Sequence, residues 1–175
     1  ILSDASNARA DITAKAITAT GVTASDKVYN ANTTAAINTA AAVITGGASA
    51  DDDKKYYTGD AVALETDGAT GAFAGKHAGI GKAVTVSGLT LSGEDADNYT
   101  VTDNSGATAD ITAKAITATG VTASDKVYNA NTTATINTAS ASITAGAATD
   151  DDKKYYTGDA VALETAGATG AFADK

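Results

Sequence analysis

The chain has 175 residues, of which 12 are basic and 21 acidic, so its formal net charge is −9; it contains no cysteine, methionine, tryptophan or proline. Without cysteine there can be no disulfide, no thiolate nucleophile and no zinc–thiolate site. The acidic balance argues against nucleic acid and against an anionic membrane surface as partners, because both require clustered Lys and Arg. With only two Phe and seven Tyr, we expect a thin two-layer module without a deep pocket.

Short strands are predicted along the first half of the chain. In residues 11–24 the apolar alternation changes phase near Lys15 and Ala16, which predicts a strand that moves to another sheet or domain there. The next segment, KVYNANTTA, reads as a short strand followed by Asn-rich turn chemistry. Residues 36–47 are Ala-rich and fit either helix or strand, but Thr, a Val-Ile pair and a terminal Gly pair favour strand.

The two clearest strand patterns follow a polar loop and a Gly-rich stretch. They are AVTVSGLTLSG, with Val84 and Val86 on one face, and NYTVTD, with Tyr99 and Val101 on one face. No segment has the pattern of an amphipathic helix. About seven short strands separated by turns predict an all-β fold of the sandwich type.

A tandem repeat dominates the organisation of the chain. Residues 11–76 recur as residues 110–175 at a constant offset of 99 positions, with 8 mismatches in 66 positions. This spacing predicts elongated β-sandwich (Ig-like) modules joined end to end. We expect residues 1–10 to be the end of a preceding repeat, residues 11–109 a complete repeat unit and residues 110–175 a truncated second unit.

Acidic clusters are the candidate metal sites. Glu94, Asp95 and Asp97, in the turn GEDADN, space their oxygens as calcium ligands can be spaced. The alternative, which we favour, is a solvated turn before a strand. The runs at 51–53 and 150–152 fit a solvated loop better than a calcium site, because three consecutive Asp cannot all face one ion and Lys54 and Lys55 follow. Calcium is the only cofactor that the sequence suggests.

Other candidates carry weaker signals. The pairs Tyr56-Tyr57 and Tyr155-Tyr156 can stack on a sugar ring, although one Tyr of each pair is expected to enter the core. N-x-[ST] triplets begin at residues 32, 98 and 131, and His77 is the single histidine. No Ser-His-Asp arrangement or phosphate-binding loop is present, so we predict that the protein is not an enzyme and has no catalytic residues.

The segments ITAKAITATGVTASDKVYNANTTA and GKAVTVSGLTLSGEDADNYTVTDNSGATADITAK resemble the YDG-type repeat of large bacterial surface adhesins and filamentous-haemagglutinin-like exoproteins. The resemblance implies a secreted or cell-surface bacterial protein in which many units form a shaft. The family's Asp-Gly is Asn30-Ala31 here and Asn129-Ala130 in the second copy. Since Ala tolerates positive φ poorly, the turn must place Asn in that conformation or change type.

These observations predict a structural spacer or stalk segment of an extracellular bacterial adhesin or surface filament. The expected partners are neighbouring repeats of the same chain, with no nucleic acid and no membrane insertion. The alternative is an adhesive module that binds glycans or like chains, in which tandem units add avidity or build a fibre through exposed strand edges.

Overall fold

The computed structural model describes residues 9–48, 54–103, 105–147 and 153–175. Their regular structure is all β except for one 3-10 turn, η1 (Ala96–Asn98), so the fold class predicted from the sequence is confirmed at this level. None of the described helical residues forms a helix long and apolar enough to cross a membrane. The acidic runs at 51–53 and 150–152 lie outside the described residues.

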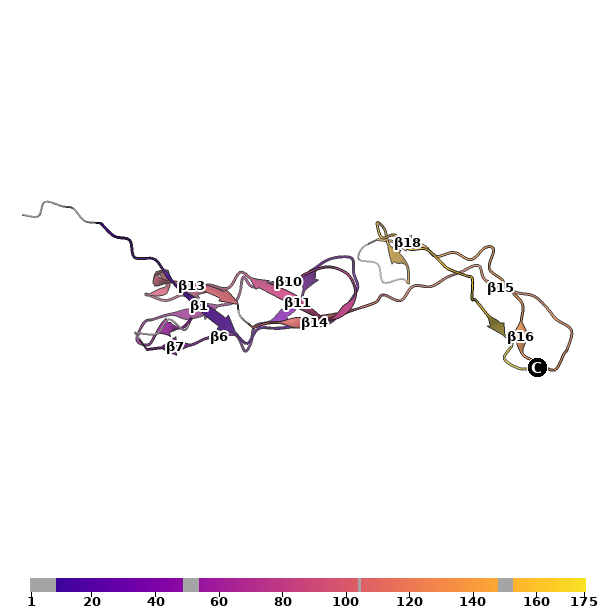
Figure 1. Cartoon of the computed structure of the whole chain (residues 1–175), viewed down its shortest axis with the longest axis horizontal. Helices are drawn as coiled ribbons and strands as arrows, with labels where there is room; N and C mark the ends of the chain where they lie inside the picture. The colour runs from indigo at the N-terminus through magenta and orange to yellow at the C-terminus, as the bar shows by residue number, and fades with distance from the viewer. Residues whose placement is uncertain (1–8, 49–53, 104, 148–152) are drawn as a thin grey trace, which may run out of the picture. The chain divides into compact units, whose positions relative to one another are not determined.

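The chain divides into two compact units. Unit 1 comprises residues 1–27, 33–75 and 79–110, and unit 2 comprises residues 28–32, 76–78 and 111–175. Two short segments of the first sequence copy, around Tyr29 and Lys76, therefore belong to the unit formed mainly by the second copy. In Figure 1 the colour follows the residue number and so distinguishes the first sequence copy from the second.

Residues 15–112 form two main sheets and three short ladders. The larger sheet has the order β3-β14-β11-β10-β4 and the smaller has the order β13-β1-β6, in which β1 is parallel to β13 and antiparallel to β6. The ladders pair β12 with β9, β2 with β5 and β7 with β8. The strands are β1 (Lys15–Thr20), β2 (Thr23–Ala24), β3 (Lys27–Val28), β4 (Thr34–Ala35), β5 (Ile37–Asn38), β6 (Val43–Ile44), β7 (Gly46–Gly47), β8 (Tyr56–Tyr57), β9 (Ala63–Glu65), β10 (Thr70–Phe73), β11 (Gly79–Ser87), β12 (Thr90–Ser92), β13 (Tyr99–Asp103) and β14 (Thr108–Thr112).

Unit 2 repeats part of this pairing in the same register. The Thr23↔Asn38, Gly46↔Tyr56 and Ala35↔Gly71 pairs of the first copy recur 99 residues later in three ladders, β15-β17, β18-β19 and β16-β20. The strands are β15 (Thr122–Ala123), β16 (Thr133–Ala134), β17 (Ile136–Asn137), β18 (Ala145–Gly146), β19 (Tyr155–Tyr156) and β20 (Gly170–Ala171). The sequence of β11, β12 and β13 occurs once in the 175 residues.

The phase change predicted near Lys15 separates two strands in the structure. In the second copy the residues Asp110, Ile111 and Thr112 are the last three of β14, which belongs to the five-stranded sheet. In the first copy the equivalent residues 11–13 precede β1, which begins at Lys15 and belongs to the three-stranded sheet. As a result Ile111 is buried in β14, while its counterpart Ile12 is fully exposed. The structure thus has a boundary at the predicted position, but in neither copy does one strand pass from one sheet to the other, because residues 11–14 and residues 113–118 are not in strands.

The other predictions of strands and turns are confirmed in part. The NYTVTD pattern forms one strand, β13, with Tyr99 buried as expected. The AVTVSGLTLSG pattern is not one strand but two in different sheets, β11, in which Val84 is buried, and β12. Residues 36–47 are not one strand but three two-residue pieces, β5, β6 and β7. The expectation for Asn30-Ala31 is corrected, because Ala31 itself adopts a φ of 60° and Ala130 a φ of 59°. Alanine thus occupies the left-handed region that normally favours glycine.

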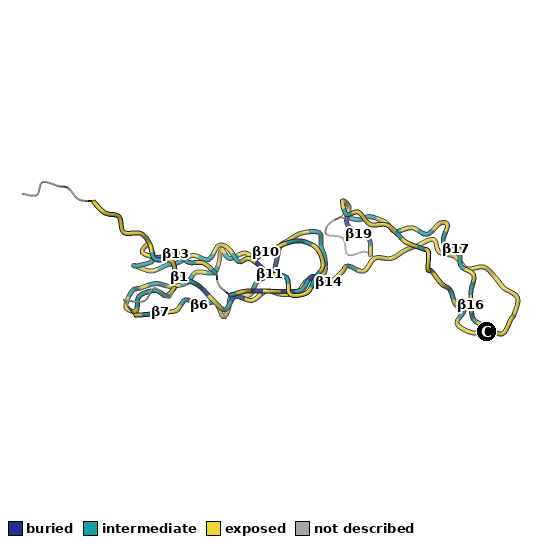
Figure 2. Tube along the Cα trace, viewed as in Figure 1, coloured by how far each residue is buried: buried dark blue, intermediate teal, exposed yellow. Residues whose placement is uncertain are grey.

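The core is thin and is concentrated in the first copy. Its buried side chains include Ile17, Val22, Phe73, Val84 and Tyr99. Figure 2 shows that dark, buried stretches are common along the first copy and sparse along the second. The contrast arises between nearly identical sequences, so it reflects which strands are available to cover each one.

Candidate functional site

The most developed polar site of unit 1 is a cluster in which a tyrosine binds an aspartate. The Tyr99 hydroxyl donates to Asp60 Oδ2 at 2.5 Å and accepts from the backbone N–H of Tyr57 at 2.9 Å. The Tyr57 and Tyr99 rings meet edge to face with centroids 6.5 Å apart. Lys15 Nζ lies 4.1 Å from the centroid of the Tyr57 ring and donates to the carbonyl of Lys55 at 2.7 Å. We call these four residues the first tyrosine–aspartate cluster.

The turn after the tyrosine pair positions the aspartate. The motif YYTGD places Gly59 at a φ of 112°, a conformation that side chains rarely adopt, and Asp60 N–H donates back to the carbonyl of Tyr57 at 3.1 Å. The second copy repeats this turn, with Gly158 at a φ of 99° and a 3.0 Å bond from Asp159 N–H to the carbonyl of Tyr156. Each turn therefore holds its carboxylate where the hydroxyl of a tyrosine from another segment reaches it.

Unit 2 builds the same cluster with a different tyrosine. Tyr29 donates its hydroxyl hydrogen to Asp159 Oδ2 at 2.7 Å, and its ring lies 5.8 Å from that of Tyr156. Lys114 Nζ lies 4.3 Å from the centroid of the Tyr156 ring, as Lys15 does on Tyr57. Lys76 adds an ion pair of 2.8 Å with Asp159 Oδ1. These five residues form the second tyrosine–aspartate cluster.

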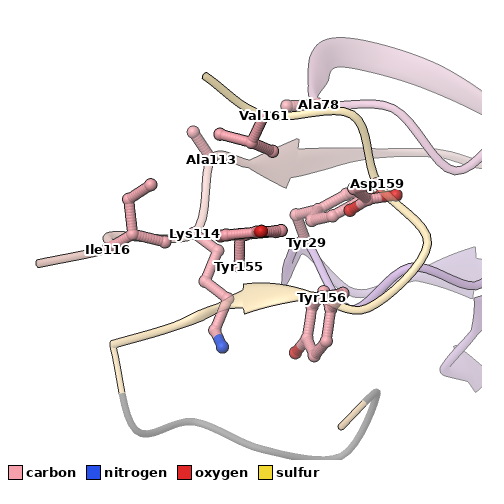
Figure 3. A pocket seen from close by; sticks show the side chains of 9 residues that line it. All are labelled: Tyr29, Ala78, Ala113, Lys114, Ile116, Tyr155, Tyr156, Asp159 and Val161. Atoms are coloured by element: carbon pink, nitrogen blue, oxygen red, sulfur yellow. The ribbon is translucent and has the colours of Figure 1, made fainter. Parts of the chain in front are cut away.

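A cavity of about 290 Å³ opens beside this second cluster, and Figure 3 shows the side chains around it. Aromatic rings and a carboxylate share the cavity wall with small and branched apolar side chains. The lining residues are Tyr29, Ala78, Ala113, Lys114, Ile116, Tyr155, Tyr156, Asp159 and Val161. This mixture of flat rings and one acceptor is compatible with an amphipathic ligand.

The electrostatics of both clusters favour a neutral tyrosine, and those of the second cluster also favour an ionised Asp159. Burial, together with the hydrogen bond to Asp60, raises the pKa of Tyr99. Burial and the bond to Asp159 raise the pKa of Tyr29 in the same way. The hydrogen bonds from Lys76 and Tyr29 lower the pKa of Asp159, and the bond to Asp159 raises the pKa of Lys76. The clusters therefore act as polar clasps between strands and turns.

The predicted calcium ligands do not converge in the structure. Asp95 Oδ2 accepts a 2.8 Å hydrogen bond from the backbone N–H of Ala61, and Asp95 precedes η1, which contains Asp97. Glu94 is exposed. In the described part of the chain, no three His, Cys, Asp or Glu side chains are grouped closely enough to hold a metal ion. Calcium binding by Glu94, Asp95 and Asp97 stays a prediction without geometric support.

The remaining sequence candidates are placed as follows. Tyr57 contributes to the first cluster and Tyr156 to the second, so each tyrosine pair has one member in a cluster. His77 is exposed, and Tyr99 of the triplet starting at Asn98 is buried. Sequence reasoning missed Tyr29, Asp60, Lys76 and Asp159. The sequence contains seven Tyr and two Phe, and a buried Tyr hydroxyl requires a polar partner. This excess of Tyr was the signal that could have indicated contacts between tyrosines and charged side chains.

Comparison with known families gives one match. The model of the YDG domain matches residues 13–107, which is more than half of the chain and lies within the first repeat, residues 11–109. No curated protein and no solved structure matches the chain.

This match corrects the more specific resemblance drawn from the sequence. Domains of this name are known from SRA-type DNA-binding proteins, and the match carries nothing that points to repeats of bacterial surface adhesins or filamentous-haemagglutinin-like exoproteins. The assignment to that class is therefore withdrawn, and the adhesin, stalk, filament and secreted character that it implied loses its support. What stands is the domain family and the β-rich fold: the chain belongs to the YDG domain family.

Proposed function

We propose that this chain is a structural spacer made of tandem modules, each an elongated β-sandwich of the Ig-like kind, joined end to end. The single observation that carries the proposal is the recurrence of three strand ladders at the same 99-residue offset as the sequence. A duplicated sequence that keeps its pairing register supplies length by addition of like units.

The junction between the sequence copies supports this reading. Strand β14 runs from Thr108 to Thr112, so the passage from residue 109 to residue 110 lies inside a hydrogen-bonded strand. A Gly-Ser tract or a charged run, which would give a flexible tether, does not occur at this point of the sequence. A spacer benefits from such a junction because reach depends on stiffness as well as on residue number.

The charged side chains support a structural role over a catalytic one. Asp60 and Asp159 each accept a hydrogen bond from a tyrosine hydroxyl, and Lys76 is paired with Asp159. These contacts tie segments together and leave the carboxylates engaged within the fold. We accordingly propose no enzymatic activity and no required cofactor, while a location outside the cell stays a prediction from acidity and the lack of cysteine.

DNA binding is not favoured by the chemistry of this chain. Domains of the same name occur in DNA-binding proteins of the SRA type. Here acidic side chains outnumber basic ones 21 to 12. Phosphate contacts need clustered Lys and Arg, and a net charge of −9 repels a polyanion.

A second candidate function is carbohydrate binding at the cavity of unit 2. Tyr155 and Tyr156 contribute rings and Asp159 contributes a carboxylate to one wall of that cavity. Aromatic faces bind the apolar faces of sugars, and a carboxylate accepts sugar hydroxyls. A glycan array probed with the full chain tests this candidate. Binding of glycans by the unmodified chain and loss of that binding in Tyr155→Ala would support this candidate. Tyr128→Ala is the matched control, because Tyr128 is an exposed tyrosine outside the cavity.

The spacer proposal itself is tested by lengthening the chain. Inserting further copies of residues 11–109 between residues 109 and 110 keeps every junction identical to the existing one. Small-angle scattering then measures how the largest dimension of the molecule grows with each added repeat. Growth by a constant increment supports the spacer.

A further inference from the structure

Two short segments of the first sequence copy take part in the packing of the second copy. Residues 28–32 and 76–78 group with residues 111–175 in unit 2. The backbone N–H of Tyr29 donates to the carbonyl of Thr112 at 2.8 Å. The side chains of Tyr29 and Lys76 both reach Asp159, which lies in the second copy. The compact unit is therefore offset from the sequence copy.

Tyr156 is at the centre of this packing. Among the described residues from 113 to 175 it is the only buried one, with an exposure of 5%. The ring of Tyr29 lies 5.8 Å from the Tyr156 ring, and Lys114 Nζ lies 4.3 Å from the centroid of that ring. Burial of apolar surface is the dominant favourable term in folding. The most buried part of the second copy is thus completed by a side chain that the first copy supplies.

Asp159 adds a polar connection to the same two segments. Its Oδ2 accepts the Tyr29 hydroxyl at 2.7 Å, and its Oδ1 lies 2.8 Å from Lys76 Nζ. The side chains of Asp159 and Lys76 are 17% and 37% exposed, so water screens this ion pair less than it screens a fully exposed one. Both oxygens of one carboxylate are therefore engaged by side chains of the preceding copy.

The corresponding cluster of unit 1 is built within one copy. The Tyr99 hydroxyl bonds to Asp60 and to the backbone N–H of Tyr57, and all three residues belong to the first copy. A substitution of Tyr29 removes contacts with Asp159 and Tyr156 and none of these. Its effect should therefore fall on the second copy, although Tyr29 itself lies in the first.

We propose that Tyr156 and Asp159 form an acceptor surface of the second copy whose partner is the preceding copy, which binds it through Tyr29 and Lys76. The stability of the second copy is consequently set in part by residues of the first. Successive copies are coupled by this surface, as nearest-neighbour interfaces couple the units of a repeat protein. The inference goes beyond the spacer role, because a row of independently stable modules would supply length equally well.

The test is hydrogen–deuterium exchange of the full 175-residue chain, followed by mass spectrometry of its peptides. The peptide of residues 155–168 reports on unit 2, because the backbone N–H groups of Tyr155 and Thr157 are hydrogen-bonded there. It differs from its first-copy counterpart at Ala166, so the two peptides have different masses. The peptide of residues 79–92, whose sequence occurs once, reports on unit 1.

Tyr29→Ala should raise the exchange rate of the unit 2 peptide at least about fivefold, because a hydrogen bond to a carboxylate and a ring contact are lost together. The unit 1 peptide should stay within about twofold of its original rate. Tyr128→Ala is the matched control, because Tyr128 is the equivalent residue of the second copy and is exposed. This control should leave both peptides unchanged.

Milder variants keep the test valid if Tyr29→Ala misfolds. Tyr29→Phe removes only the hydrogen bond and Lys76→Ala only the ion pair, so each should speed exchange of the unit 2 peptide by a smaller factor. Tyr29→Phe and Asp159→Asn should have less than additive effects when combined, since they remove the same contact. Equal exchange of the unit 2 peptide in Tyr29→Ala and Tyr128→Ala would overturn the proposal, and so would an equal acceleration of both peptides in Tyr29→Ala. Neither result bears on the scattering test of the spacer.

Discussion

The hydroxyl of Tyr99 donates a 2.5 Å hydrogen bond to Asp60, and these residues belong to strand β13 and to the turn after β8, respectively. The same hydroxyl accepts from the backbone N–H of Tyr57. One buried side chain therefore fastens the three-stranded sheet to the YYTGD turn. Unit 2 keeps the aspartate and the turn but uses Tyr29, which shows that the acceptor is a feature of each repeat and that its tyrosine can come from different segments.

Tyr99→Phe is expected to destabilise unit 1 by about 1–3 kcal/mol, because it leaves Asp60 and the Tyr57 N–H without their shared partner in a partly buried site. Chemical denaturation followed by circular dichroism measures the change. Tyr128→Phe is the matched control, since Tyr128 is exposed. Equal stability of Tyr99→Phe and the unmodified chain would show that the clasp contributes nothing to folding.

Strand β11 provides a sharper test of the core. Val84 is buried, and Thr85, its neighbour on the other face, is exposed. Val84→Asp places a charge in the apolar layer and should cost several kcal/mol, out of the roughly 5–15 kcal/mol that a domain has in total. Thr85→Asp should cost less than about 0.5 kcal/mol. Similar melting temperatures for the two variants would mean that the facing of β11 is misassigned.

Ala31 and Ala130 should respond to glycine in the direction opposite to most alanines. Both hold φ near 60°, where a Cβ atom is strained by about 1–2 kcal/mol. Glycine relieves this strain but loses more entropy on folding, so Ala31→Gly and Ala130→Gly are each expected to stabilise by about 0.5–1 kcal/mol. Ala36→Gly, outside the positive-φ positions, should destabilise instead. Thermal melts of the three variants make the comparison.

The tyrosine clasps also predict a pH dependence. Because the pKa of Tyr99 and of Tyr29 is raised in the folded chain, their contribution is full below the ordinary value of 10.0 and is lost as pH rises through the raised value. Asp159 has a lowered pKa, so its contribution is present above 3.8 and is lost as pH falls through the lowered value.

The ionisation of the tyrosines is measured directly by the absorbance of tyrosinate as the pH is raised from neutral to alkaline values. The folded chain should show a late-ionising fraction that shrinks in Tyr99→Phe and shrinks further in the double variant with Tyr29→Phe. An unchanged titration curve in the double variant would contradict the assignment of the raised pKa to these two side chains.

The sequence predicted the all-β class, the strands at β11 and β13 and a boundary near Lys15, because each leaves a local pattern of alternation or its interruption. It did not predict the pairing of Tyr99 with Asp60 or of Tyr29 with Asp159. Those contacts join residues 39 and 130 positions apart, respectively, and no local period reports them. It also failed at Ala31, where the turn geometry overrides the backbone preference of alanine.

The contrast between Ile17 and Ile116 has the same origin. The two residues sit in identical sequence, so propensity and pattern assign them the same environment. One is covered by β13 and the other is not, and the sequence of β13 occurs once in the 175 residues. Repeated sequence predicts repeated local structure, but burial follows from the partners that each copy meets.

Each added repeat should add the same length to the molecule. Small-angle scattering of the chain with none, one and two extra copies of residues 11–109, inserted between residues 109 and 110, tests it most directly. We expect the largest dimension to rise by the same increment with each copy and each sample to fit one narrow distribution of shapes. Growth that follows about the square root of repeat number, as for a flexible coil, would contradict it.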